Sequence, residues 1–183
     1  MKAKKKDIRA LSREEIREFF QNTGDKAFRG NQVYEWLWSK GAHHFDDMTN
    51  ISKETRELLS EHFVINHIEV DSIQKSKDGT IKNAVKLFDG LIVESVLIPT
   101  PSRTTACVST QVGCSLDCKF CATARLKKMR NLNPDEIYDQ VKAIDQESKL
   151  YHSRPLSNIV FMGMGEPLMN YNNVLKSIDK ITS

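Results

Sequence analysis

Hydrophobic residues recur with helical spacing through the first 62 residues of the chain. Ser12 followed by Glu15 has the pattern of a capping box, which predicts that a helix begins directly after Ser12. A second helix is expected around Val33 and Leu37, and a third is expected after Ser52. The aromatic residues of FRGNQVYEWLW could stack on RNA bases, but their helical spacing favours a place in the core.

The pattern then changes to the two-residue period of β-strands in three successive runs, at residues 67–76, 80–88 and 91–99. Asp-Gly pairs separate these runs, and Asp-Gly is a strong signal for a hairpin turn. The runs therefore predict a small β-meander. Pro99 and Pro101 interrupt the pattern, so we expect a linker at 98–103 and a domain boundary after residue 98.

The remaining chain, residues 99–183, reads as alternating strands and helices. Residues 104–110 predict a short strand, and residues 156–163 predict a buried one with the continuous hydrophobic run of a parallel sheet. A helix is expected to begin at Asn133-Pro134, and a last helix is expected after Asn170 or Asn172 as its cap. The order β, loop, α, β, loop, α predicts an α/β fold with a parallel sheet and right-handed crossovers. Because two such units cannot close a barrel, we expect the chain to be the N-terminal part of a longer protein.

Composition and charge narrow the class of protein. A hydrophobic fraction of 39% allows a real core, and the net charge is only +3. The excess of positive charge falls in residues 101–183, which contain a basic run formed by Lys119, Arg125, Lys127, Lys128 and Arg130. Such a run suits a polyanion such as nucleic acid, or it forms a solvated basic face. The basic N-terminus lacks an apolar signal-peptide region and no stretch resembles a membrane span, so we expect a cytoplasmic protein without membrane contact.

All four cysteines lie within fifteen positions, at Cys107, Cys114, Cys118 and Cys121. Clustered thiols in a reducing compartment favour metal binding or catalysis over structural disulfides. With Cys107 as a fourth ligand they could form a zinc site, although zinc motifs normally consist of two separated pairs. The close trio suits a 4Fe–4S cluster better, because three irons each take one thiolate and the fourth iron stays open.

The spacing C-x3-C-x2-C, with Phe120 before the last cysteine, resembles that of the radical S-adenosylmethionine (SAM) enzymes. With VESVLIP, CVSTQVGCSLDCKFCAT and GMGEPLMNY in this order, and AFRGNQVYEWLW near the N-terminus, the chain resembles the RlmN branch of the RlmN/Cfr RNA methyltransferases. The resemblance implies an N-terminal helical, RNA-binding-like domain with the meander (residues 1–98). It also implies the first two βα units of a radical SAM partial (β/α) barrel (residues 99–183), apparently truncated.

The resemblance also implies a chemistry and its participants. Such enzymes methylate C2 of adenosine in 23S rRNA and tRNA, using a 4Fe–4S cluster, SAM and a reductant such as flavodoxin or ferredoxin. One SAM methylates a cysteine of the enzyme, and a second SAM, cleaved at the cluster, activates that methyl group for transfer to adenine. The methyl-carrying cysteine lies near the family's C-terminus and is absent from this chain. A Cfr-type enzyme that methylates C8, and a non-catalytic zinc module with four cysteines that binds RNA, stay open as alternatives.

The resemblance assigns roles to seven residues of this sequence. By position, the cluster ligands are Cys114, Cys118 and Cys121, and the SAM-binding residues are Gly165 and Glu166. Cys107 matches the thiol that resolves the covalent protein–RNA adduct through a transient disulfide; it could also be a small buried strand residue. Glu94 matches a proton acceptor. It shares one strand face with Ile92, Val96 and Ile98, where a lone carboxylate would be desolvated and suited to proton transfer, unless that face is in water.

Overall fold

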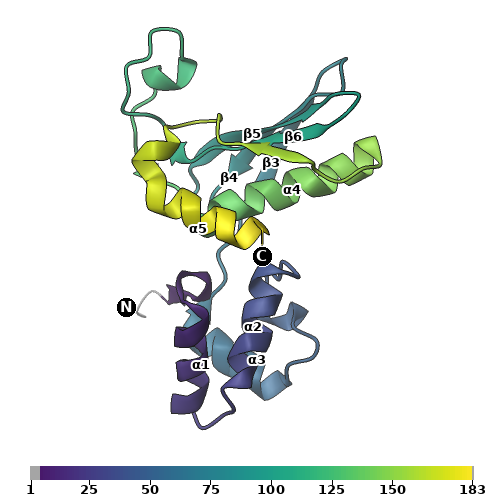
Figure 1. The fold of residues 1–183 in the computed structure, drawn as a ribbon. Helices are drawn as coiled ribbons and strands as arrows, with labels where there is room; N and C mark the ends of the chain where they lie inside the picture. Colours follow the sequence, from purple (N-terminus) through teal and green to yellow (C-terminus); the bar gives the residue numbers. More distant parts are fainter. Residues whose placement is uncertain (1–4, 183) are drawn as a thin grey trace. The chain divides into compact units, whose positions relative to one another are not determined.

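The protein is described by a computed structural model for residues 5–182, and the chain divides between Asn66 and His67 into two compact units (Figure 1). Among the described residues, no helix is both long enough and apolar enough to cross a membrane.

The first unit is helical, as the hydrophobic pattern predicts. Its elements are β1 (Lys6–Asp7), η1 (Ile8–Ala10), α1 (Arg13–Asn22), α2 (Phe28–Trp38), η2 (Phe45–Asp47), α3 (Lys53–His62) and β2 (Phe63–Val64). The predicted capping box is present: the Glu15 amide donates to Ser12 Oγ at 3.1 Å, and the Ser12 amide donates to Glu15 Oε2 at 2.6 Å. The short strands β1 and β2 pair in parallel and bring the two ends of the unit together.

The core of the first unit is built from the helical faces that the sequence marks as hydrophobic. Its buried side chains include Ile16, Phe20, Val33, Leu37 and Leu59. Gly30 allows α2 to pack closely against α1, because a Cβ atom at this position would lie 2.7 Å from the Arg17 backbone nitrogen. The aromatic residues of α2 differ in burial: Trp38 is buried in the core, Tyr34 and Trp36 are half-buried, and Phe28 is exposed.

The second unit contains a mixed sheet whose strands lie in the order β3-β4-β5-β6-β9. Their bounds are β3 (Glu69–Lys75), β4 (Ile81–Lys86), β5 (Ile92–Pro99), β6 (Thr104–Cys107) and β9 (Asn158–Val160). The first three strands pair antiparallel, which confirms the β-meander, and β6 pairs in parallel with β9, which confirms the crossover. The α/β fold class predicted from the sequence is therefore the one observed.

The predicted linker at 98–103 is wrong, because this segment is the turn of a hairpin. Strands β5 and β6 pair antiparallel, with Val96 opposite Cys107, and the Thr100 amide donates to the Arg103 carbonyl at 2.8 Å. The meander is thus continuous with the parallel strand. The division into compact units falls at residues 66 and 67 and does not coincide with the predicted boundary after residue 98.

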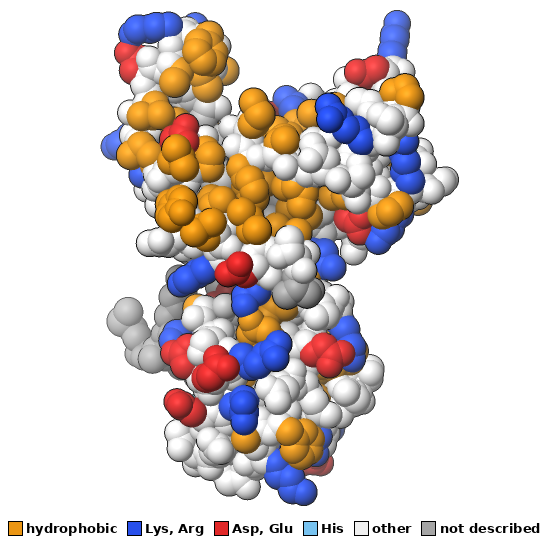
Figure 2. Space-filling view, viewed as in Figure 1, with side chains coloured by type: hydrophobic (Ala, Val, Ile, Leu, Met, Phe, Trp, Pro, Cys, Tyr) orange, Lys and Arg blue, Asp and Glu red, His pale blue; other side chains and the backbone are white. Residues whose placement is uncertain are grey.

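Helices α4 (Pro134–His152) and α5 (Tyr171–Thr182) cover one face of the sheet (Figure 1). Helix α4 begins at Pro134 as predicted, and its residues Ile137, Val141 and Ile144 are buried against the sheet residues Val85, Val93 and Leu97. The opposite face of β5 is open, since Ile92 and Ile98 are 48% and 38% exposed. Hydrophobic side chains also gather on the surface over α5 (Figure 2). Tyr171 and Leu175 of this helix are exposed, as is Leu168 just before it.

Candidate functional site

The cysteine trio lies on one protruding loop of the second unit, residues 113–129, which we call the cysteine loop (Figure 1). Its stem consists of strands β7 (Gln111–Val112) and β8 (Arg130–Asn131), which pair antiparallel. Gly113 adopts a φ of 73° at the start of the loop, and a Cβ atom here would lie 2.3 Å from the Lys127 carbonyl oxygen. Glycine therefore closes the loop tightly onto its own returning strand.

The three thiols of the cysteine loop are free and half-buried. Backbone N–H groups contact two of them: the Leu116 amide donates to Cys114 Sγ at 3.4 Å, and hydrogen bonds from the Ala124 and Thr123 amides lower the pKa of the Cys121 thiol. The lowered pKa favours the thiolate of Cys121, which is the form that ligates metals.

The donor set of the loop fits an iron–sulfur cluster. In residues 5–182, no three His, Cys, Asp or Glu side chains are close enough together to hold a single metal ion. The loop nonetheless offers three thiols at close sequence spacing with no disulfide between them, and thiolates are the usual ligands of 4Fe–4S clusters. Phe120, beside the last cysteine, is 94% exposed.

Cys107 lies on the sheet and is separated from the trio by the stem. It is the last residue of β6, between Val96 on β5 and Val160 on β9. Burial raises the pKa of the Cys107 thiol above its ordinary value, and a backbone hydrogen bond from Met162 opposes this effect. The thiol is therefore held protonated near neutral pH.

Glu94 lies on the open face of β5, and the expectation that its carboxylate is desolvated is wrong. Its side chain is 52% exposed, and its Oε1 atom forms an ion pair with Lys82 Nζ at 3.0 Å. Because Val96 is opposite Cys107, and side chains two residues apart share a face, Glu94 and Cys107 lie on the same face of neighbouring strands. The fold thus brings these two candidates to one surface of the sheet.

The motif GMGEP, residues 163–167, follows β9 and lies against the segment that leads into the cysteine loop. The Gly163 amide donates to the Val108 carbonyl at 3.0 Å, and the Met164 amide donates to Ser109 Oγ at 2.8 Å. Gly165 has a φ of 91°, and a Cβ atom at this position would lie 2.4 Å from Gln111 Cβ. Glycine at this position therefore has a reason within the chain itself, since a side chain here would collide with Gln111.

Glu166 is half-buried, and its side chain caps the 3-10 turn that follows it. Its carboxylate accepts from the Leu168 amide at 3.1 Å, at the N-terminus of η4 (Pro167–Asn170). Its own amide donates to Gln111 Oε1 at 3.0 Å. The carboxylate Oε1 is thus engaged locally, and the same group is a candidate acceptor for the ammonium of an amino acid ligand.

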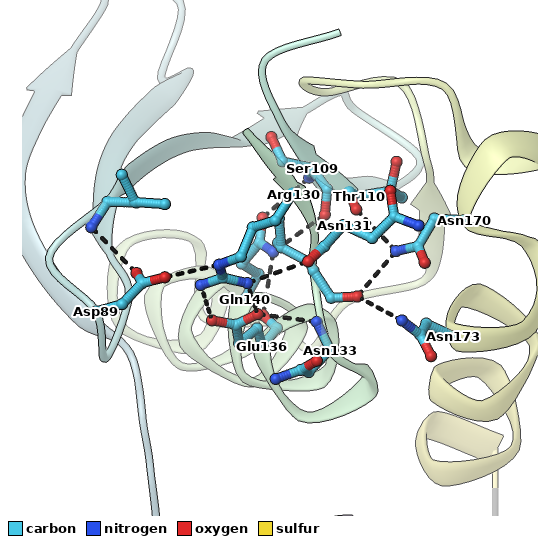
Figure 3. A network of polar contacts seen from close by, with 12 residues as sticks. Asp89, Ser109, Thr110, Arg130, Asn131, Asn133, Glu136, Gln140, Asn170 and Asn173 are labelled. Carbon is cyan, nitrogen blue, oxygen red and sulfur yellow. Dashed lines mark hydrogen bonds and ion pairs between the residues drawn. The ribbon is translucent and has the colours of Figure 1, made fainter. Parts of the chain in front are cut away.

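Sequence reasoning missed the polar side chains that hold the base of the cysteine loop (Figure 3). Asn170, considered above as a helix cap, instead donates its side-chain amide to the Thr110 and Leu132 carbonyls at 2.8 and 2.9 Å. The Gln140 amide bonds both backbone groups of Ser109, at 2.9 and 3.1 Å. These partners are distant in sequence, and no local pattern marks them.

Arg130, at the end of the cysteine loop, joins three segments (Figure 3). It donates twice to the Glu136 carboxylate on α4, both at 2.7 Å, and once to Asp89 in the turn between β4 and β5, also at 2.7 Å. Hydrogen bonding to Arg130 lowers the pKa of Asp89. Arg130 was predicted only as one member of a basic run, but its guanidinium is engaged with these two carboxylates.

Both units of the chain are similar to parts of known proteins. Residues 6–65 match the family model of the ribosomal RNA large subunit methyltransferase N-terminal domain, and residues 108–181 match the radical SAM superfamily. The chain is 77% identical over 183 residues to the probable dual-specificity RNA methyltransferase RlmN of Flavobacterium psychrophilum, and 59% identical over 180 residues to that of Cytophaga hutchinsonii. It covers 53% and 49% of those proteins, which in turn align with 100% and 98% of it.

A solved structure has the same fold. The crystal structure of a radical SAM methyltransferase from Sphaerobacter thermophilus superposes with a TM-score of 0.83 at 34% identity, over 97% of this chain and 52% of that one. The chain thus spans about half the length of the curated relatives it matches.

Proposed function

Because the chain belongs to the RlmN family of radical SAM RNA methyltransferases, we propose that its second unit contributes the cluster and SAM site of an enzyme that methylates C2 of adenosine in RNA. The observation that carries this proposal is the cysteine loop, with its three free thiols and its stem bonded directly to the GMGEP loop. We propose 23S rRNA and tRNA as substrates and a flavodoxin or ferredoxin as the reductant.

In this proposal, two loops of the second unit hold two different groups. Cys114, Cys118 and Cys121 would hold a 4Fe–4S cluster, and the GMGEP loop beside the stem would bind SAM through Gly165 and Glu166. When bound, the cluster and SAM supply the radical chemistry that an unreactive adenine carbon requires. The protein supplies the positions of these groups.

Glu94 and Cys107 are proposed to act on the RNA side of the reaction. Both lie on the open face of the sheet, where the Glu94 carboxylate is paired with the Lys82 ammonium and would be the group that accepts a proton. The Cys107 thiol would first lose its proton to a neighbouring base, and its sulfur would then bond to the sulfur of the methyl-carrying cysteine of the full-length protein. The bond between that second sulfur and the methylene group attached to the RNA would break in the same step, and its electron pair would leave with the RNA.

The test is the position of the methyl group made by the full-length protein. We expect mass spectrometry of digested RNA to find 2-methyladenosine with the wild-type enzyme and none with Cys118→Ala. A methyl group at C8 would support the Cfr-type alternative, and no methylation by a cluster-loaded wild type would contradict the proposal. Cys107→Ala should in addition retain covalently bound RNA, seen as a nuclease-sensitive shift on a denaturing gel.

A further inference from the structure

The side chain of Gln111 is fully buried in the stem of the cysteine loop and uses both ends of its amide. Its Nε2 group donates to Asn131 Oδ1 on the partner strand at 2.8 Å, and its Oε1 atom accepts from the Glu166 amide at 3.0 Å. One side chain thus bonds the returning strand of the cysteine loop and the GMGEP loop at the same time.

Asn131 extends this connection by a second amide (Figure 3 labels Asn131 and Asn170, the residue before α5). Its Nδ2 group donates to the Met169 carbonyl at 3.2 Å. The Glu166 N–H can only donate and the Met169 C=O can only accept, so both amides between them have a single orientation that satisfies every group. A carboxylate in place of either amide would break at least one of the three bonds.

The GMGEP loop also rests on Gln111 by close packing. The position of a Cβ atom on Gly165 would lie 2.4 Å from Gln111 Cβ and 2.9 Å from the Gln111 backbone nitrogen. Since a backbone in such contact has no room to shift inward, a displacement of the stem displaces the GMGEP loop with it.

We propose that Gln111 is a positioning residue which, with Asn131, couples the cysteine loop to the GMGEP loop, so that a ligand held by one loop fixes the geometry of the other. This inference rests on the proposed function for the identity of the two ligands. The coupling itself is a property of the chain and can be measured in the metal-free protein.

The first experiment compares backbone hydrogen exchange in metal-free full-length protein. In Gln111→Leu, we expect the exchange rates of the amides in residues 163–170 and in the stem to rise about tenfold. This is the protection that we expect the buried hydrogen bonds of Gln111 to give these segments. Asn83→Leu is the matched control: Asn83 is also fully buried and bonds Glu147 at 2.8 Å, but it contacts neither loop. It should leave exchange in both segments unchanged. Unchanged exchange in Gln111→Leu, or an equal rise in Asn83→Leu, would overturn the inference.

The second experiment measures the ligands after anaerobic reconstitution. Gln111→Leu should keep the wild-type iron content, bind SAM about tenfold more weakly, and show a smaller change in the EPR spectrum of the reduced cluster when SAM is added. Wild-type SAM affinity and an unaltered SAM-induced EPR change in this variant would refute the coupling. A wild-type protein that takes up no iron would instead refute the proposed function, and the exchange experiment would still decide the coupling.

A second variant keeps the inference testable if Gln111→Leu fails to fold. Asn131→Asp can accept from Gln111 but cannot donate to Met169, so it should raise exchange in residues 163–170 by a smaller factor. If Gln111→Leu does fold, the two effects should be less than additive in the double variant, because both substitutions break the same chain of bonds. Additive effects, or none in Asn131→Asp, would show that the two amides do not act together.

Discussion

Replacing Arg130 by methionine should destabilise the second unit by about 3 kcal/mol, because it removes the ion pairs that close the cysteine loop. Glu136 is 2% exposed and receives two of the three short bonds from Arg130. Removing one partner of a buried ion pair typically costs about 3–5 kcal/mol. We expect the lower end, since Arg130 is one-quarter exposed and the Asn133 amide still donates to Glu136 at 2.8 Å.

The assay is urea denaturation at pH 7, with two comparison variants. Lys149→Met breaks an ion pair with Asp145 on the same helix, but Lys149 is 59% exposed, so the change should stay below about 0.5 kcal/mol. Arg130→Lys keeps the charge but loses the paired hydrogen bonds of the guanidinium. Its loss of stability should lie between those of Arg130→Met and Lys149→Met. If Arg130→Met and Lys149→Met differ by less than about 0.5 kcal/mol, the reasoning on the buried pair is wrong.

Two further predictions concern buried positions. Burial raises the pKa of Glu147, so the folded state binds its proton more tightly, and the stability of the wild type should fall as pH rises from about 4 through that raised pKa. Glu147→Gln should therefore be more stable than the wild type at pH 7 by roughly 1 kcal/mol, because its amide can also donate to Asn83 Oδ1, which has no partner among the described residues. Denaturation of both proteins at pH 7 and at pH 4 checks this prediction. An equal difference in stability at the two pH values would contradict it. Gly165→Ala should lower Tm more than Gly24→Ala does. Both glycines have positive φ, but of the two only Gly165 has another residue, Gln111, within 4 Å of the added Cβ atom. Equal Tm shifts would show that the collision with Gln111 does not destabilise the protein.

The features predicted correctly from the sequence are those encoded locally. The capping box at Ser12, the Asp-Gly turns of the meander and the Pro134 helix start each involve residues within a few positions of one another. The spacing of the cysteine trio is equally local, and so it could be recognised before any fold was known. The linker at 98–103 was a local inference that failed, because prolines end a strand without showing whether a hairpin follows.

The environment of the site could not be predicted, because it depends on partners that are far apart in the chain. Glu94 was expected in an apolar setting from its neighbours on the strand, but the pairing of β4 with β5 places Lys82 beside it in solvent. Gln111, Asn131 and Asn170 are ordinary polar residues in the sequence. Only the fold brings their amides to the base of the cysteine loop.

The central claim, that the cysteine trio holds the cluster and Cys107 does not, is tested most directly by iron and sulfide content after anaerobic reconstitution of the full-length protein. Cys114→Ala, Cys118→Ala and Cys121→Ala should each lose most of the iron and the EPR signal of the reduced cluster, because each removes one of three ligands. Cys107→Ala should retain both, since Cys107 lies on β6 in the sheet. If Cys107→Ala loses iron as fully as the other three variants, the site has four thiolate ligands and the account of an open iron for SAM is contradicted.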